Sequence, residues 1–327
     1  MKKLLAVVVC LGMQSAYATK ARMSALGQDA ARGSFYIEDN RNIWRSANAV
    51  SELDQMVTIE HGTNYLDANG NAQTATAEGG FFMPIGGHQI GFYLNNDNYG
   101  KVEGVGGAES GRAELFFGRP SMMNFGLRLG YETINLDAND TDGTSFDLGV
   151  SADISGVGLW FNYVPKVTIT VGGADKDVDA SMNLGATYAL GSYDVFFEYE
   201  KSDDDNSEII LGTAHVHGFD GGFYFHDLVL SQTDDGTNSD TKVSIGFGVE
   251  YQAAAWLQWR MSVRQALLQS GDSGVSAADT TVGAGAALTF KDLSIEGSLQ
   301  GLVNTAANNT RLGTNNLLSN VSVKYNF

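Results

Sequence analysis

Five histidines are the side chains of this 327-residue chain best suited to metal or acid–base chemistry. His215 and His217 alternate on one strand face, a spacing that lets both imidazoles reach one ion, and His226 follows on the next strand. His61 and His88 lie near strand ends without motif partners. No carboxylate cluster completes a site, so we expect interface-facing histidines, with no metal and no cofactor.

Catalytic nucleophile motifs are missing as well. The chain has neither a Gly-x-Ser-x-Gly elbow nor the His-x-Ser pair of membrane phospholipases. We therefore predict no catalytic residues and a protein that is not an enzyme.

Acidic stretches raise the question of calcium binding. Residues 137–143, Asp-Ala-Asn-Asp-Thr-Asp-Gly, resemble a calcium loop, but Gly143 is the seventh residue where an EF-hand needs glycine sixth. Residues 203–205 and 234–235 are similar aspartate runs. Solvated loops are the simpler interpretation.

A third group of charged residues recurs at every second position of otherwise apolar segments, on the face opposite the large apolar side chains. It comprises Arg112, Glu114, Arg128, Glu132, Asp147, Asp153, Asp179, Glu198, Glu250, Arg260, Arg264 and Glu296. Opposed acidic and basic side chains across a pore create a transverse field, and an acidic excess favours cations. What these residues do depends on the elements that carry them.

Apolar residues beyond residue 54 alternate with a period of two, as in strands with one apolar and one polar face. In residues 124–132, Phe125, Leu127, Leu129 and Tyr131 alternate with polar positions, and residues 146–154, 178–188, 243–250 and 257–264 behave alike. Many such segments run for about ten residues, enough to cross a bilayer when tilted by about 45°. Aromatic residues gather near the segment ends, where they would meet lipid headgroups.

Short and long connections alternate along the chain. Tight turns are expected at residues 86–87, 120–121, 155–156, 191–192, 220–221, 252–254 and 291–292, and longer polar loops at 95–110, 135–143, 171–177, 203–206, 233–239, 269–278 and 304–316. Transmembrane barrels have this asymmetry. We predict an all-β, antiparallel up-and-down transmembrane barrel over residues 54–327, with about 16 strands, or 14 if two weak early strands merge. The charged face must then line the lumen, where Gly126, Gly149, Gly185, Gly246 and Gly283 would leave room.

Composition excludes several other classes. With 38 acidic against 20 basic residues the net charge is −18, so the basic surface of a nucleic-acid binder is missing. No apolar run after the N-terminus has the roughly 20 residues of a membrane-spanning helix. The aromatic content of 10% is too high for a disordered chain.

The first 18 residues have the pattern of a secretory signal peptide. Lys2 and Lys3 precede an apolar run from Leu4 to Met13, and Ala16-Tyr17-Ala18 is a small-x-small cleavage site. Cleavage after Ala18 would remove the only cysteine, Cys10. Export without cysteine is typical of the Gram-negative envelope.

The C-terminal sequence Val-Ser-Val-Lys-Tyr-Asn-Phe, residues 321–327, resembles the last strand of bacterial outer-membrane β-barrels. The resemblance implies that Tyr325 and Phe327 form the signal read by the barrel-insertion machinery. It also implies an outer-membrane location, with lipid and lipopolysaccharide as surroundings. For the acidic loops, divalent ions that bridge them to lipopolysaccharide remain an open alternative to simple solvation.

Residues 19–53 differ from the barrel segments, since they do not alternate and carry five basic against four acidic side chains. Residues 25–27, 30–33 and 39–44 resemble the N-terminal hatch of the long-chain fatty-acid transport family, although residues 44–48 replace that family's Asn-Pro-Ala turn. The resemblance implies a plug in the lumen, with Arg32, Arg41, Trp44 and Arg45 as candidate contacts. Its partners would be inward carboxylates such as Asp147, Asp153, Asp179, Glu198 and Glu250. A short periplasmic helix or tail is the alternative.

The leading functional hypothesis is a porin-like channel for passive diffusion of small solutes through a polar, acid-biased lumen. The alternatives are a plugged barrel that transports hydrophobic compounds and a structural or adhesive barrel without an open pore. No long constriction loop is evident, and the sequence leaves the solute and any oligomer open.

Overall fold

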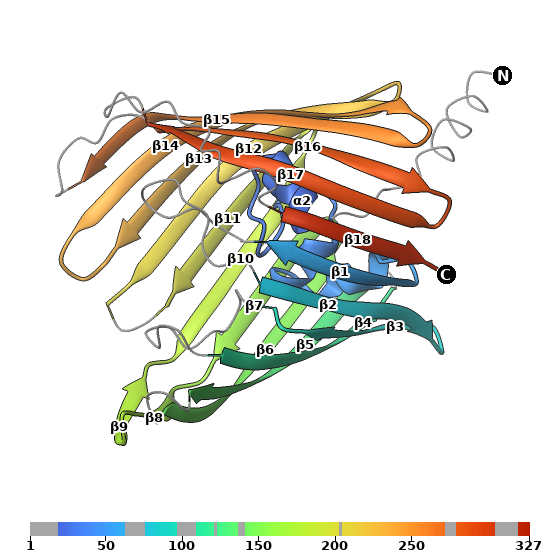
Figure 1. The fold of residues 1–327 in the computed structure, drawn as a ribbon. Coiled ribbons are helices and arrows are strands. Elements are labelled where there is room, and N and C mark those ends of the chain that lie inside the picture. The colour runs from blue at the N-terminus through green and yellow to red at the C-terminus, as the bar shows by residue number, and fades with distance from the viewer. Residues whose placement is uncertain are drawn as a thin grey trace.

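The computed structural model describes residues 19–62, 76–96, 109–120, 123–136, 141–202, 205–271, 279–304 and 320–327, and shows a closed antiparallel barrel (Figure 1). Its strands are β1 Met56–Gly62, β2 Thr76–Ile85, β3 His88–Leu94, β4 Glu109–Arg119, β5 Met123–Leu136, β6 Thr141–Ile154, β7 Val157–Val164, β8 Val167–Val171, β9 Ala174–Val178, β10 Ser181–Leu190, β11 Tyr193–Lys201, β12 Ser207–Phe219, β13 Gly222–Asp234, β14 Ser239–Ala254, β15 Leu257–Gly271, β16 Asp279–Phe290, β17 Leu293–Asn304 and β18 Asn320–Asn326.

Strand pairing closes the sheet on itself. The first strand, β1, pairs with β2 on one side and with the last strand, β18, on the other. The wall bypasses β8 and β9, because β7 pairs directly with β10. Of the 18 strands in the described ranges, 16 therefore form the ring, which confirms the predicted barrel and its strand number.

The two faces of the wall differ as the alternation predicts. In β1, burial alternates residue by residue, with Met56, Thr58 and Glu60 inside. The outer face carries large exposed apolar side chains such as Leu129 and Phe247, each 48% exposed. An apolar exterior on a closed barrel is the arrangement that lipid requires. Among the described residues, no helix is long and apolar enough to cross a membrane.

The connection between β7 and β10 differs from the prediction. Residues 171–177, expected to form a loop, and the start of the expected strand 178–188 instead build the β8–β9 hairpin, and β10 begins only at Ser181. Gly172 and Gly173 both have positive φ, 63° and 77°, which suits a tight two-residue turn. Asp179 therefore lies between β9 and β10 rather than on a lumen-facing wall strand.

Asp179 instead belongs to an exposed ion cluster beside the hairpin. Lys166 Nζ lies 3.0 Å from Asp177 Oδ2 and 3.4 Å from Asp179 Oδ1. Hydrogen bonds to Asp177 and then to Asp179 raise the pKa of Lys166, and the same bond from Lys166 lowers the pKa of Asp177.

A second correction concerns the turn expected at residues 252–254. β14 continues to Ala254, and the turn is made by residues 255–256. The register between β14 and β15 shifts between Gln252 and Ala254. A β-bulge there adds one residue to β14 and moves the turn along the chain.

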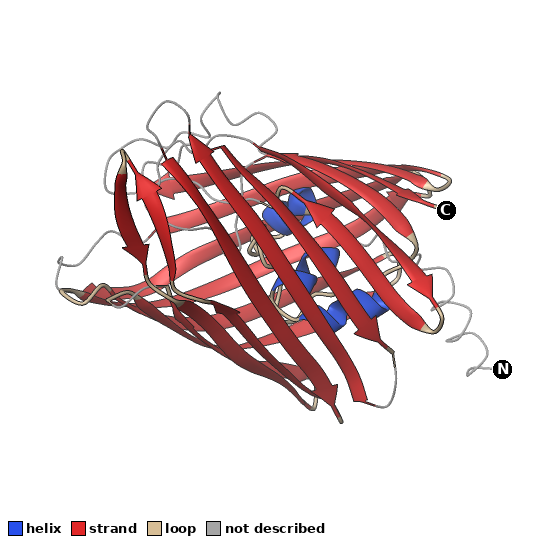
Figure 2. Cartoon of the chain, turned by 90° about the horizontal axis from the view of Figure 1, so that it is seen from below, coloured by secondary structure: helices blue, strands red, loops and turns tan. Residues whose placement is uncertain are grey.

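Residues 19–53, called the inner segment below, lie inside the ring of strands (Figure 2). They form one short α-helix, α2 (Lys20–Ala25), and two 3-10 helices, η1 (Asn40–Trp44) and η2 (Ala47–Glu52). Two apolar clusters join this segment to the wall: one around Trp44 includes Phe82, Tyr93 and Phe116, and one around Met23 includes Phe225. The hydrophobic core therefore lies between the inner segment and the barrel wall.

An arginine on the outer face tests the membrane assignment. Phe247 is in the middle of β14, so Phe247→Arg should cost about 2–4 kcal/mol of stability in lipid vesicles, whereas Tyr251→Arg near the strand end should cost about 0–1 kcal/mol. Urea titration of the folded fraction measures both. Equal, small costs would contradict a lipid-facing β14.

Candidate functional site: the charged lumen and the inner segment

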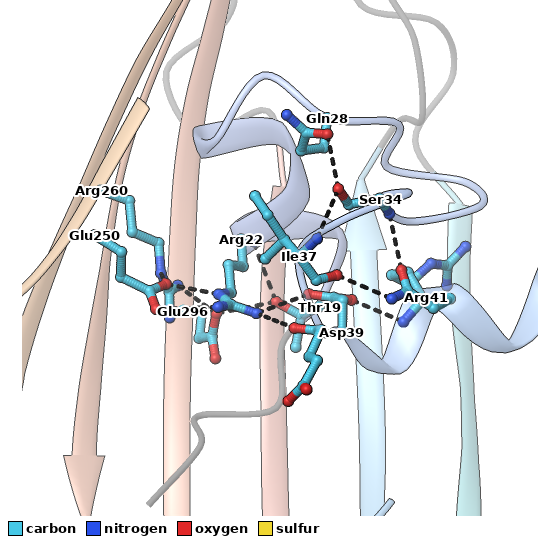
Figure 3. Close-up of polar contacts among 12 residues, drawn as sticks. Thr19, Arg22, Gln28, Ser34, Ile37, Asp39, Arg41, Glu250, Arg260 and Glu296 are labelled. Atoms are coloured by element: carbon cyan, nitrogen blue, oxygen red, sulfur yellow. Dashed lines mark hydrogen bonds and ion pairs between the residues drawn. The ribbon is translucent and has the colours of Figure 1, made fainter. Parts of the chain in front are cut away.

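Helix α2 directs Lys20 and Arg22 toward carboxylates of the wall. Its N-cap is Thr19, whose hydroxyl oxygen accepts a hydrogen bond from the Arg22 backbone N–H at 3.4 Å. Arg22 binds Glu250 of β14 through two bonds, Nε to Oε2 at 2.6 Å and Nη2 to Oε1 at 3.0 Å (Figure 3). This bidentate geometry is among the strongest that a guanidinium makes. Arg260 extends the chain of pairs to Glu250 at 2.7 Å and to Glu296 at 2.5 Å.

Arg41, like Lys20, is a fully buried cation of the inner segment. Asp39 caps η1 by accepting the Arg41 backbone N–H at 2.7 Å, which turns the guanidinium toward β1 and β2. There it pairs with Glu60 at 2.9 Å and with Glu78, and stacks 3.8 Å from the Trp44 ring centroid. Both glutamates and Arg41 have no exposed side-chain surface, so each charge depends on the others for stabilisation.

The third contact lies against β11. Arg45 Nε is 3.2 Å from Glu198 Oε2, and Arg32 Nη1 is 3.3 Å from Glu198 Oε1. Arg32 also pairs with Glu200, and Arg45 lies 3.9 Å from the Phe35 ring centroid. Arg32 and Glu200 are partly exposed, at 16% and 34%, so this contact reaches water.

Across β4, β5 and β6 charged residues of the wall pair with one another. Arg112 and Arg128 both bind Asp147, at 2.5 and 2.9 Å, and Arg128 also binds Glu114 at 3.2 Å. Glu132 lies 3.7 Å from Arg112. The inner segment joins this network through Trp44, whose Nε1–H donates to Glu114 at 2.8 Å.

The carboxylates named as partners of the inner segment divide in two. Glu198 and Glu250 contact it, whereas Asp147 pairs within the wall. Asp153 accepts the Gly156 N–H at the β6–β7 turn, and Asp179 lies outside the barrel wall. Arg264 faces Asp227 of β13 at 2.6 Å, where the Tyr36 hydroxyl also donates.

Sequence reasoning missed several residues of these contacts: Lys20, Arg22, Glu60, Glu78 and Asp227. Alternation in residues 56–62 carries the signal for Glu60, which shares a face with Met56 and Thr58. Nothing in the spacing pairs Glu60 with Glu78 or with Arg41.

Wall glycines accept the backbone of the inner segment. A Cβ atom at Gly126 would lie 2.0 Å from the Asn48 nitrogen, and one at Gly283 would lie 2.6 Å from the Ala25 carbonyl oxygen. A Cβ at Gly118 would meet Val50 at 2.5 Å. The small lumen residues, expected to leave open space, thus leave space that the inner segment fills at Gly126 and Gly283.

The described histidines and the described parts of the acidic runs do not assemble a metal site. His215, His217 and His226 lie outside the charged lumen, with the His215 and His226 ring centroids 5.3 Å apart and His215 Nδ1 2.5 Å from the Ser192 carbonyl oxygen. Within the described ranges, no group of three or more His, Cys, Asp or Glu residues is arranged to hold a metal ion. Residues 137–140 and 203–204 of the acidic runs lie outside the described residues, as do residues 1–18.

The two residues of the proposed insertion signal lie on the outer face at the end of β18. Tyr325 is 49% and Phe327 is 58% exposed, with ring centroids 6.4 Å apart. The Phe327 N–H donates to the Gln55 carbonyl oxygen at 3.3 Å, next to the start of β1. This position leaves both rings accessible at the seam that closes the barrel.

Removing a buried cation should loosen the inner segment. Arg41→Ala leaves Glu60 and Glu78 buried together. We therefore expect the free energy of opening, measured at amides of residues 19–53, to fall by about 3–5 kcal/mol. Arg32→Ala, at a partly exposed pair, should cost about 1 kcal/mol or less. Hydrogen exchange measures both, with β14 amides as the reference; equal effects of the two changes would contradict the burial of Arg41.

No protein-family model matches this chain, and no curated protein matches it. Among solved structures it is similar to engineered variants of the porin of Rhodopseudomonas blastica. One has 15% identity and a TM-score of 0.41 over 84% of this chain and 99% of that chain, and a second has the same identity and score over 84% and 100%. At this level of likeness, the barrel architecture rests on the strand pairing of the chain itself.

Proposed function

We propose that this chain is a channel of the bacterial outer membrane through which small solutes diffuse, with cations preferred, and that the inner segment acts as a plug whose position controls passage. The observation that supports this proposal most strongly is the burial of Lys20, Arg22 and Arg41 against wall carboxylates. The signal-peptide pattern and the C-terminal strand support the location.

The charges around Arg32, at its partly exposed contact with Asp29 and Glu200, support the preference for cations. Asp29 and Glu200 keep 31% and 34% of their side-chain surface exposed, more than Arg32 at 16%. Carboxylates that reach water raise the local concentration of cations. A solute approaching this part of the lumen therefore meets negative charge first.

Burial supports the role of a plug. Arg41 is 0% and Trp44 1% exposed, so no water-filled path runs beside these two side chains. Passage beside these two side chains requires the inner segment to move or loosen. The apolar clusters around Trp44 and Met23 are filled by the segment's own side chains, so they give no support to a route for hydrophobic compounds.

A reversible lock tests the plug. The only cysteine is Cys10, in the predicted signal peptide, so Val50→Cys with Gly118→Cys introduces a single pair. A Cβ at Gly118 lies 2.5 Å from Val50 Cγ1, which places the two Cβ atoms near the separation that a disulfide needs. In planar bilayers we expect the oxidised protein to conduct less than the same protein after reduction, with Val50→Cys alone unaffected by redox state.

Two outcomes would contradict the proposal. A steady conductance that is the same in the oxidised and the reduced protein would place the inner segment outside the conduction path. Silence of the folded protein in both redox states, and also with Arg41→Ala, would instead support a structural barrel.

Ion preference is tested separately. In a KCl gradient the reversal potential should show cation preference. Glu208 of β12 lies opposite Glu200 of β11 in the strand register, and both are half-buried. Glu200→Gln with Glu208→Gln should reduce the cation preference, because two neighbouring carboxylates lose their charge. Asp177→Gln, on the exposed hairpin, is the control. Anion preference in the unmodified protein would refute the acid-biased lumen.

A further inference from the structure

Four lumen residues form a row across neighbouring strands. Strand register places Glu296 of β17 opposite Ser322 of β18, Ser322 opposite Glu60 of β1, and Glu60 opposite Glu78 of β2. Because adjacent strands lie about 4.8 Å apart, this row presents three carboxyl groups and one hydroxyl along one level of the lumen.

The start of the inner segment lies along this row. Thr19 Oγ1 donates to Glu296 Oε2 at 3.1 Å, the Lys20 backbone N–H donates to Glu60 Oε1 at 3.3 Å, and Lys20 Nζ pairs with Glu78 Oε2 at 2.9 Å. Figure 3 shows Thr19 beside Glu296. These contacts place Thr19 at the Glu296 end of the row and Lys20 at the end formed by Glu60 and Glu78.

Two acceptors of the row lack donors. Within the part of the chain that the structure describes, no hydrogen bond reaches Glu296 Oε1 or Ser322 Oγ. Glu296 is 1% exposed, and Ser322 and Thr19 are 0% exposed, so bulk water does not satisfy these atoms. A buried carboxylate oxygen without a donor is costly, so an additional donor at Glu296 Oε1 would stabilise this end of the row, although Arg260 and Thr19 already bind the other oxygen, Oε2.

The predicted cleavage after Ala18 would create such a donor. Hydrolysis breaks the amide bond between Ala18 and Thr19, the oxygen of water passes to the Ala18 carboxylate, and the Thr19 nitrogen leaves as an amine that is protonated at neutral pH. Before cleavage this nitrogen is an uncharged amide with a single hydrogen. After cleavage it is an ammonium with three N–H donors.

We propose that the α-ammonium group of Thr19, formed by processing after Ala18, is bound in the lumen by Glu296 Oε1 and Ser322 Oγ and thereby fixes the inner segment. Processing is then a maturation step for the barrel interior as well as for export. The proposal depends on where the inner segment lies and not on whether the barrel conducts.

Amine labelling tests this directly. Protein purified from outer membranes should begin at Thr19 by mass spectrometry. In reductive methylation with formaldehyde and cyanoborohydride, the Thr19 amine should react at least about tenfold more slowly in the folded than in the unfolded protein, because labelling requires local opening. The exposed Lys291 should react at similar rates in both and serves as the internal control.

Two variants separate the proposal from simple burial. Refolded protein that begins at Ala18 moves the ammonium by one residue, about 3.8 Å, and should lose the protection. Glu296→Gln should lose most of it, whereas Glu132→Gln, at a buried carboxylate in the β4–β6 network, should keep it. Circular dichroism verifies that each variant is folded. A different mature N-terminus, a Thr19 amine as reactive as Lys291, or equal protection in the Ala18 form would overturn the proposal.

Discussion

Pairing between cations of the inner segment and carboxylates of the wall is the interaction on which the barrel interior depends. Lipid excludes charge from the outer face, so the alternating strands direct their ionisable residues inward. Arg22, Arg41 and Arg45 then meet Glu250, Glu60 and Glu198 at 2.6–3.2 Å. Each guanidinium combines a carboxylate with an aromatic ring, and lysine lacks the planar, forked group that serves both contacts.

Charged residues of the wall have different partners in two parts of the barrel. Across β4–β6, Arg112 and Arg128 pair with Asp147 and Glu114 within the wall. On β1 and β2, Glu60 and Glu78 pair with the inner-segment cations Arg41 and Lys20. A ring of this width is too wide for its own side chains to fill, and the inner segment supplies both the missing volume and the missing charge.

The strict period of two made the barrel predictable, because lipid on one side and polar surroundings on the other act on every wall residue. The errors have local causes: a bulge near Gln252 moved one turn, and the Gly172-Gly173 turn made a hairpin from an expected loop. Alternation assigns a residue to a face but not to a partner. Glu60 meets Glu78 and Arg41 only because β1 pairs with β2 and the inner segment folds back into the ring, which no local pattern encodes.

Trp44 provides the most direct measurement of the central claim that residues 19–53 occupy the lumen. It is 1% exposed and is one of four tryptophans, so replacing Trp160, Trp256 and Trp259 by Phe isolates its fluorescence. In lipid vesicles, iodide should barely quench Trp44 in the folded protein and should quench it fully after unfolding. Strong quenching in the folded protein would contradict the account and would place the segment in the aqueous phase outside the barrel.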